Sequence, residues 1–322
     1  CIGTPLQEAG DYTVGTIYGN VTITAPGVTL RDSIISGDLY VSGGVGLGSV
    51  RLENTTVLGR IIVSGAGESE GGDMSLALVN VTADEMVVDN MKNQYVTIRA
   101  EGNTNIASTS VRAPTYLQDN TPLESGFREI VLEGESGTTL DLAGRIKSVT
   151  NKTPLSTVKM AKGTAQKITV DEDATGAQLL IERGASVREV NLDVATQVLG
   201  SGDVDKLNVN APGSIISMLP DDIYIRPGIT ANINGQDMDA NAAEEASESP
   251  RLLTGYPAAR DVAPTSLKAA FATNKRGTVY WAVSPIADGS VSAEDLISPP
   301  SYGSLAVANG SVLSPTATDD TV

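Results

Sequence analysis

The sequence predicts an all-β protein: a parallel β-helix, which is a solenoid with about three short strands per coil, followed by a small β-sandwich-like domain. Similar strand openers recur every 18 to 22 residues in the first part of the chain, and such periods are typical of solenoids. Aromatic residues are only 4% of the 322 residues, and Gly is abundant at 33. The apolar residues are mostly Val, Ile, Leu and Ala beside many Thr, Ser and Asn, a mixture that suits short strands joined by turns.

Each repeat opens with a short strand that follows a glycine or a turn. The clearest openers are "GNVTI", "GDLYV" and "GRIIV", and each alternates apolar with polar residues, as a strand with one buried face does. A glycine-rich turn follows each of them. Related openers recur in the middle of the chain, so the predicted repeat-start glycines are Gly19, Gly37, Gly59, Gly144, Gly163, Gly184 and Gly202.

A second strand follows each turn, and two residues after it comes Asp32, Asn54 or Asn80. Equivalent residues of successive coils stack at the strand spacing of ~4.8 Å. We therefore expect these three side chains to form a ladder at an inside corner, where stacked amides satisfy one another. A ligand- or metal-binding role for the three residues is the alternative interpretation.

The ends and the middle of the solenoid depart from this pattern. Residues 1–18 are a candidate N-terminal cap or extension, because uncovered edge strands invite aggregation. The segment 103–127 interrupts the repeat, and we expect an irregular coil or a loop that projects from the side. The parallel β-helix is thus predicted over residues 19–235.

Residues 236–250 are polar and acidic, and predict a linker with a short helix at 242–246. Residues 251–322 predict a β-sandwich with Phe271 and Trp281 in its core. This segment is shorter than the ~100 residues of such a domain. Three explanations stay open: truncation at Val322, an atypical small domain, or completion by a strand from another chain.

Composition excludes several functions. The net charge of −17 and pI of about 4.3 argue against binding of nucleic acid or anionic lipid. The absence of His removes the commonest general base and zinc ligand. Cys1 is the only cysteine, so no intrachain disulfide forms. Cys1 either carries the lipid of a bacterial lipoprotein or is an incidental cut point. No apolar run of 18 residues predicts a membrane span.

Three acidic clusters are candidates for catalytic or metal-binding groups. They are Asp84-Glu85, Asp171-Glu172-Asp173 and Asp221-Asp222. Each is expected at a turn or strand end, where Asp is favoured on conformational grounds. The segment 170–176 has some features of a calcium loop but lacks its full ligand set. We therefore expect no catalytic residue, metal or cofactor.

The segment "GNVTITAPGVTLRDSIISGDLYVSGGVGLGSVRLENTTVLGRIIVSGAG" resembles the β-helical repeat regions of Gram-positive bacterial surface proteins, which often accompany S-layer homology modules. "GYPAARDVAPTSLKAAFATNKRGTVYWAVSP" resembles the fibronectin type III-like modules that follow such regions. The resemblance implies an extracellular, wall-associated location and transfers no catalytic residue.

The function that these observations predict is structural: a non-enzymatic building block of an extracellular filament, stalk or surface layer, which self-associates or contacts other cell-wall components. An adhesin that binds a glycan is the alternative, with the 103–127 segment as its carrier. A polysaccharide-active enzyme is the third possibility.

Overall fold

The computed structural model describes residues 4–46, 48–66, 76–90, 95–122 and 125–247, except for the side chain of Glu245. Beyond these it describes only the backbone of five strands between 258 and 321. The chain divides into two compact units, Cys1–Glu244 and Glu245–Val322. Cys1, Val322 and much of the glycine-rich turn 65–72 therefore lie outside the described residues.

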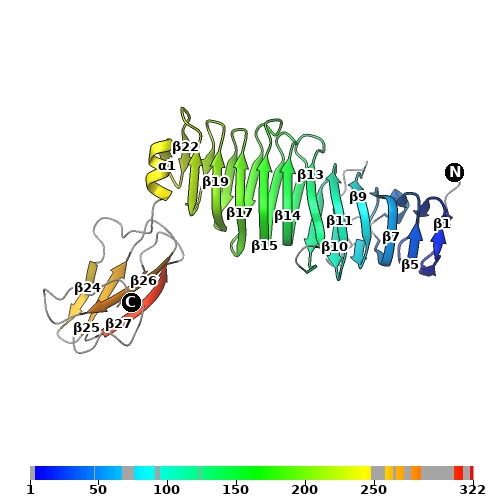
Figure 1. Cartoon of the computed structure of the whole chain (residues 1–322), viewed down its shortest axis with the longest axis horizontal. Helices are drawn as coiled ribbons and strands as arrows, with labels where there is room; N and C mark the ends of the chain where they lie inside the picture. The colour runs from blue at the N-terminus through cyan, green and yellow to red at the C-terminus, as the bar shows by residue number, and fades with distance from the viewer. Residues whose placement is uncertain are drawn as a thin grey trace. The chain divides into compact units, whose positions relative to one another are not determined.

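The first unit is a parallel β-solenoid of about ten turns, which confirms the predicted β-helix (Figure 1). Strands of successive coils pair in parallel on three faces. The first face contains β1 (Thr4–Leu6), β4 (Val21–Ile23), β6 (Leu39–Val41), β21 (Asp222–Ile225) and the ends of β7 (Val50–Val63), β9 (Thr82–Val88), β11 (Asn105–Val111), β13 (Gly126–Leu132), β14 (Thr139–Asn151), β15 (Thr157–Val170), β17 (Ala185–Leu192) and β19 (Asp203–Val209).

The second face begins after a turn in each coil. It contains β2 (Gly10–Thr13), β8 (Leu76–Val79), β10 (Val96–Glu101), β12 (Thr115–Asp119), β16 (Gln178–Ile181), β18 (Gln197–Gly200), β20 (Ile215–Ile216), β22 (Ala231–Ile233) and the starts of β5 (Val28–Ile35), β7, β14 and β15. The third face contains β3 (Thr16–Ile17) and the remaining parts of the longer strands. One short 3-10 helix, η1 (Gly43–Val45), lies between β6 and β7.

The core consists of columns of aliphatic side chains. On the first face, Leu6, Ile23, Val41, Val63, Val88 and Val111 follow one another in register, each at most 4% exposed. Each such side chain contributes about 1.5–3 kcal/mol by its removal from water. The alternation of buried and exposed residues seen in the sequence thus places one stripe of every strand inside the solenoid.

The strands of the segment 103–127 belong to regular coils, so the predicted irregular coil is not found in β11, β12 or the start of β13. The connection between β12 and β13 includes residues outside the described ones, where the predicted projecting loop is not tested. β11, β12 and β13 pair in parallel with the strands of the coils on both sides. The inward residues Ile106, Leu117 and Phe127 are fully buried. Gly126 begins β13, but no glycine begins β11 or β12. These strands keep the apolar alternation, and the alternation determines the pairing.

The first coil lies within the segment that was expected as a cap. β1, β2 and β3 pair in parallel with β4 and β5. Residues 4–17 are therefore a coil of the same type as those that follow.

The C-terminal end of the solenoid is closed by a hairpin and a helix. β23 (Gln236–Met238) pairs antiparallel with β22, and α1 (Ala240–Ser247) follows it. Asn234 and Gly235 both have positive φ, 49° and 81°, as the two-residue turn of a tight hairpin requires. Residues 236–247 thus contain a strand and a helix, and α1 includes the predicted short helix at 242–246. The boundary between the two units, Glu244/Glu245, falls within the predicted linker. The Asn-Gly pair is the sequence signal for the hairpin, which was not predicted.

The second unit contains two small antiparallel sheets. One consists of β24 (Ala258–Ala263), β25 (Ser266–Phe271) and β28 (Asp320–Thr321), and the other of β26 (Gly277–Val283) and β27 (Ala308–Ser314). Phe271 ends β25, and Trp281 lies in β26 opposite Gly310. The predicted core role of their side chains lies outside the described residues.

Candidate functional site

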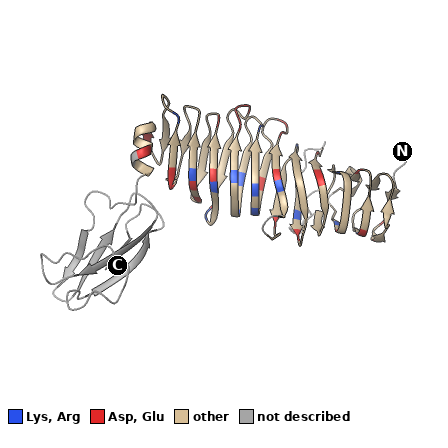
Figure 2. Ribbon diagram, viewed as in Figure 1, with Lys and Arg blue, Asp and Glu red and all other residues tan. Residues whose placement is uncertain are grey.

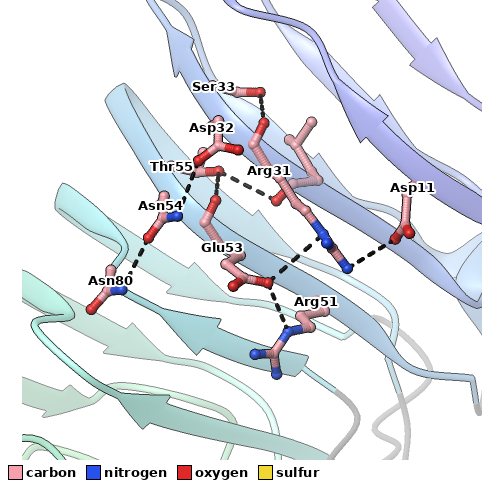
Figure 3. A network of polar contacts seen from close by, with 10 residues as sticks. Asp11, Arg31, Asp32, Ser33, Arg51, Glu53, Asn54, Thr55 and Asn80 are labelled. Carbon is pink, nitrogen blue, oxygen red and sulfur yellow. Dashed lines mark hydrogen bonds and ion pairs between the residues drawn. The ribbon is translucent and has the colours of Figure 1, made fainter.

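A network of polar contacts follows one corner of the first coils (Figure 3). Asn54 Nδ2 donates to Asp32 Oδ1 at 3.0 Å, and Asn80 Nδ2 donates to Asn54 Oδ1 at 2.9 Å. The structure therefore brings the three predicted ladder residues together. All three side chains are solvent-exposed, so the ladder lies outside the corner and the expected inside position is wrong.

The backbone explains both the residue type and the exposure. Asp32, Asn54 and Asn80 have φ of 46°, 48° and 55°, the left-handed region that Asn and Asp tolerate better than other side chains. In the next coil Gly102 takes this position with φ 61°, and the backbone N–H of Asn103 donates to Asn80 Oδ1 at 2.8 Å. The ladder ends there because glycine has no side chain to continue it.

The buried side of the same corner is occupied by hydroxyl groups. Thr55 is fully buried and its Oγ1 donates to the Glu53 carbonyl at 3.0 Å. Thr104 is also fully buried, accepts from the Val81 N–H at 3.2 Å and donates to the Leu78 carbonyl at 3.0 Å. These bonds satisfy backbone groups that the turn leaves without a strand partner.

Ion pairs accompany the ladder on the neighbouring face. Arg31 lies 3.3 Å from Asp11 and 3.8 Å from Glu53, and Arg51 lies 3.3 Å from Glu53. These contacts link three successive coils (Figure 3). The side chains are 29–68% exposed, so each pair contributes little to stability on its own.

A second, shorter ladder explains the repeated strand openers. Asn20 Oδ1 accepts the N–H of Asp38 at 2.9 Å, and Asp38 Oδ1 accepts the N–H of Arg60 at 2.9 Å. The pKa of Asp38 lies below its ordinary value, mainly because its carboxylate accepts the hydrogen bond from the Arg60 backbone N–H. Burial raises this pKa, whereas the Arg60 guanidinium and the Tyr40 hydroxyl lower it further. An Asx residue after the opening glycine therefore ties one coil to the next. The sequence analysis did not identify this second ladder.

The predicted repeat-start glycines take several positions. Gly19, Gly37 and Gly59 stack, with Gly37 N–H donating to Gly19 O and Gly59 N–H to Gly37 O. Gly184 and Gly202 directly precede β17 and β19. Gly59, Gly144 and Gly163 do not start strands but lie inside β7, β14 and β15.

Gly144 and Gly163 mark a bend where a continuous strand passes from the second face to the third. They are in register, with φ of 90° and 91°. A Cβ on Gly163 would collide with the Gly144 carbonyl oxygen. Glycine is required here by both the backbone conformation and the close approach of the neighbouring coil.

Among the described residues, one carboxylate is buried in the core, where no sequence pattern predicted it. Asp119 is 1% exposed and follows Ala100 in an otherwise apolar column. Its carboxylate accepts from Thr121 N at 2.9 Å, Thr121 Oγ1 at 2.6 Å and Phe127 N at 2.9 Å. Burial raises the pKa of Asp119, against the lowering effect of these hydrogen bonds and of Arg145. The contacts tie Thr121 and Phe127, which lie on either side of residues 122–126, to β12.

The acidic clusters that are candidates for catalytic groups lie apart in the structure. Asp84 and Glu85 lie in β9, Asp171 and Asp173 form a turn in which Asp173 N–H donates to Asp171 Oδ1 at 3.2 Å, and Asp222 begins β21. Within the described ranges, no group of three or more Asp, Glu or Cys side chains has a geometry that could hold a metal ion. Among the same residues, no helix is long and apolar enough to cross a membrane.

Comparisons with known proteins do not show a family for this chain. No family model matches the chain, and no curated protein matches it. Among solved structures, chitinase ChiW from Paenibacillus sp. strain FPU-7, described as a bacterial cell-surface-expressed multi-modular enzyme, aligns with 70% of this chain at 17% identity and a TM-score of 0.41. The aligned part is 18% of that protein, so this chain spans less than a fifth of its length. A similarity at this level carries no argument about fold or function.

Proposed function

We propose that the chain is a non-enzymatic structural element of a bacterial cell surface, in which the solenoid acts as a stiff building block of a filament, stalk or surface layer. The observation that supports this is the continuous register of the coils. Aliphatic columns fill the core, and the ladder Asp32–Asn54–Asn80 joins successive coils outside it. Bending the solenoid would pull successive coils apart and break many of these contacts at the same time. The solenoid therefore resists bending.

The dimensions suit a spacer. About ten turns at the ~4.8 Å spacing of paired strands give a rod of roughly 50 Å. Its surface is acidic, and the chain has a net charge of −17, which favours solubility outside the cell. The extracellular, wall-associated location rests on the resemblance of the repeats to bacterial surface proteins. Lipidation of Cys1 and a fibronectin-like sandwich in residues 251–322 remain parts of this proposal.

Assembly and inactivity are tested on the full chain. Negative-stain microscopy and analytical ultracentrifugation, across protein concentration, salt and calcium, should show rods that associate into larger particles. Monomers under every condition would contradict a filament or layer role. Incubation with pectin and alginate should release no reducing ends. Release that is lost in Asp84→Asn/Glu85→Gln would instead establish the enzyme alternative. Mass spectrometry of the native protein tests the lipid at Cys1.

A further inference from the structure

In seven successive coils, the corner between the third face and the first carries two consecutive outward residues. In order along the axis these pairs are Asp84-Glu85, Ala107-Ser108, Arg128-Glu129, Lys147-Ser148, Gln166-Lys167, Arg188-Glu189 and Asp205-Lys206. Most of these side chains are long and charged, and Figure 2 shows basic and acidic residues banded over the middle strands. Ala107, Ser108 and Ser148 are the small exceptions.

The small side chains leave a hollow in this corner. It has a volume of about 390 Å³ and is lined by Ala107, Ser108, Arg128, Glu129, Lys147 and Ser148 from the adjacent strands β11, β13 and β14. This volume lies at the lower end of the 300–1,000 Å³ that is typical of small-molecule sites. The lining comes entirely from strands and is therefore fixed by the stack, as a preformed site requires.

The charges at the hollow differ from those further along the corner. Lys167 and Glu189 are register partners and pair at 3.5 Å. Glu129, in contrast, has Ser108 and Ser148 as its register partners. Within the part of the chain that the structure describes, neither Arg128 nor Glu129 makes an ion pair or a side-chain hydrogen bond. Their charged groups are thus available to a ligand.

We propose that this hollow binds a saccharide that carries a carboxylate or phosphate group. The Arg128 guanidinium offers the planar donor pair that matches such an anion. The Arg128 guanidinium makes no ion pair among the described residues, so an anionic group is the ligand group that suits it best.

The remaining lining residues indicate a sugar. The Ser108 and Ser148 hydroxyls and the Glu129 carboxylate are partners for the hydroxyl groups of a saccharide. Ala107 is the only apolar lining residue, and no aromatic residue lines the hollow. A hydrophobic peptide side chain would thus bury little apolar surface there. This site would give the structural rod a binding function that its proposed role does not require.

The test is isothermal titration calorimetry on the full chain with three probes: trigalacturonate, its methyl ester and glucose 6-phosphate. At least one of the two anionic probes should bind, and which of them binds tells a carboxylate from a phosphate ligand. The ester should bind at least about tenfold more weakly than trigalacturonate if the carboxylate is the recognised group, since a charge-assisted hydrogen bond is lost.

Two variants and one control locate the site. Arg128→Gln should weaken binding about tenfold, and Ala107→Trp should abolish it by filling the hollow, without disturbing the core because Ala107 is exposed. Arg226→Gln, at an exposed arginine just after β21, should bind as the wild type does. Circular dichroism confirms folding. Failure of both anionic probes, or wild-type binding by Arg128→Gln and Ala107→Trp, would overturn the proposal, as would equal weakening by Arg226→Gln.

Discussion

Asn54 and Asp32 are 22 residues apart in sequence, and the Asn54 amide nitrogen lies 3.0 Å from the Asp32 carboxylate oxygen. Both residues have left-handed backbone conformations. We predict that Asn54→Gly lowers the free energy of unfolding by about 1 kcal/mol, because it removes the ladder bonds but keeps the conformation. Asn54→Ala should cost about 1 kcal/mol more, because alanine is strained there. Urea unfolding of both variants measures the difference, and equal losses would show that the conformation contributes nothing.

Gly163 tests the bend between two faces. Gly163→Ala should lower the free energy of unfolding by more than about 2 kcal/mol, because φ is 91° and the new Cβ would collide with the Gly144 carbonyl. Gly228→Ala is a matched control: its φ is 87°, and nothing lies within 4 Å of the added Cβ. Thermal unfolding compares the two. Similar losses would mean that the neighbouring coil moves aside without cost.

Two fully buried threonines should respond in opposite directions to replacement by valine. The Thr109 hydroxyl has no hydrogen-bond partner among the described residues, and the side chain stacks between Met86 and Ile130. Thr109→Val should stabilise the protein by about 1 kcal/mol. Thr115 donates to the Ala113 carbonyl at 2.8 Å, so Thr115→Val should destabilise it by a similar amount, about 1 kcal/mol. Destabilisation by Thr109→Val would indicate an ordered water bound to that hydroxyl.

Asp119 should make stability depend on pH in an unusual direction. Burial raises its pKa above the ordinary 3.8, so the folded state takes up a proton before the unfolded state as pH falls. The wild type should therefore gain stability relative to Asp119→Asn as the pH falls through the raised pKa towards 3.8. At neutral pH the variant should be about 1–3 kcal/mol less stable, because the amide group cannot accept all three hydrogen bonds. A wild-type advantage that shrinks on acidification would contradict this.

Glu133 should show the opposite dependence. The Ser110 hydroxyl, at 2.7 Å, is the main cause that lowers its pKa below the ordinary 4.5, and Arg112 adds to it. The stabilisation is present above 4.5 and is lost as pH falls through the lowered pKa. Glu133→Gln should cost less than about 1 kcal/mol at neutral pH, since the Arg112–Glu133 pair is partly exposed and screened. The variant and the wild type should become equally stable in acid, and a persistent gap would show that the amide packs poorly.

The period of the coils was predictable because the alternation of apolar residues and the Asx spacing are local properties of the chain. The exposed position of the ladder was not, because the left-handed conformation of Asp32, Asn54 and Asn80 turns the side chains out of the core. The coils at 103–127 were not predicted because no glycine begins β11 or β12, although the inward apolar residues continue the alternation there.

The hollow near Arg128 could not be predicted from sequence. It depends on which corner residues of three coils become neighbours, and the unequal coil lengths obscure that register. Asp119 was missed for a related reason: its partners Thr121 and Phe127 lie in a segment without repeat spacing. Contacts along the axis are therefore the least accessible to sequence reasoning.

The tight turn at Asn234-Gly235 has a consequence for how this protein can grow longer. Because β23 runs back against β22, the last parallel edge is already occupied, and a further coil has no template on that side. Any duplication that lengthens the rod has to insert its new coil upstream of β22. An engineer who wishes to extend it should splice within the body and leave the terminal hairpin and α1 untouched.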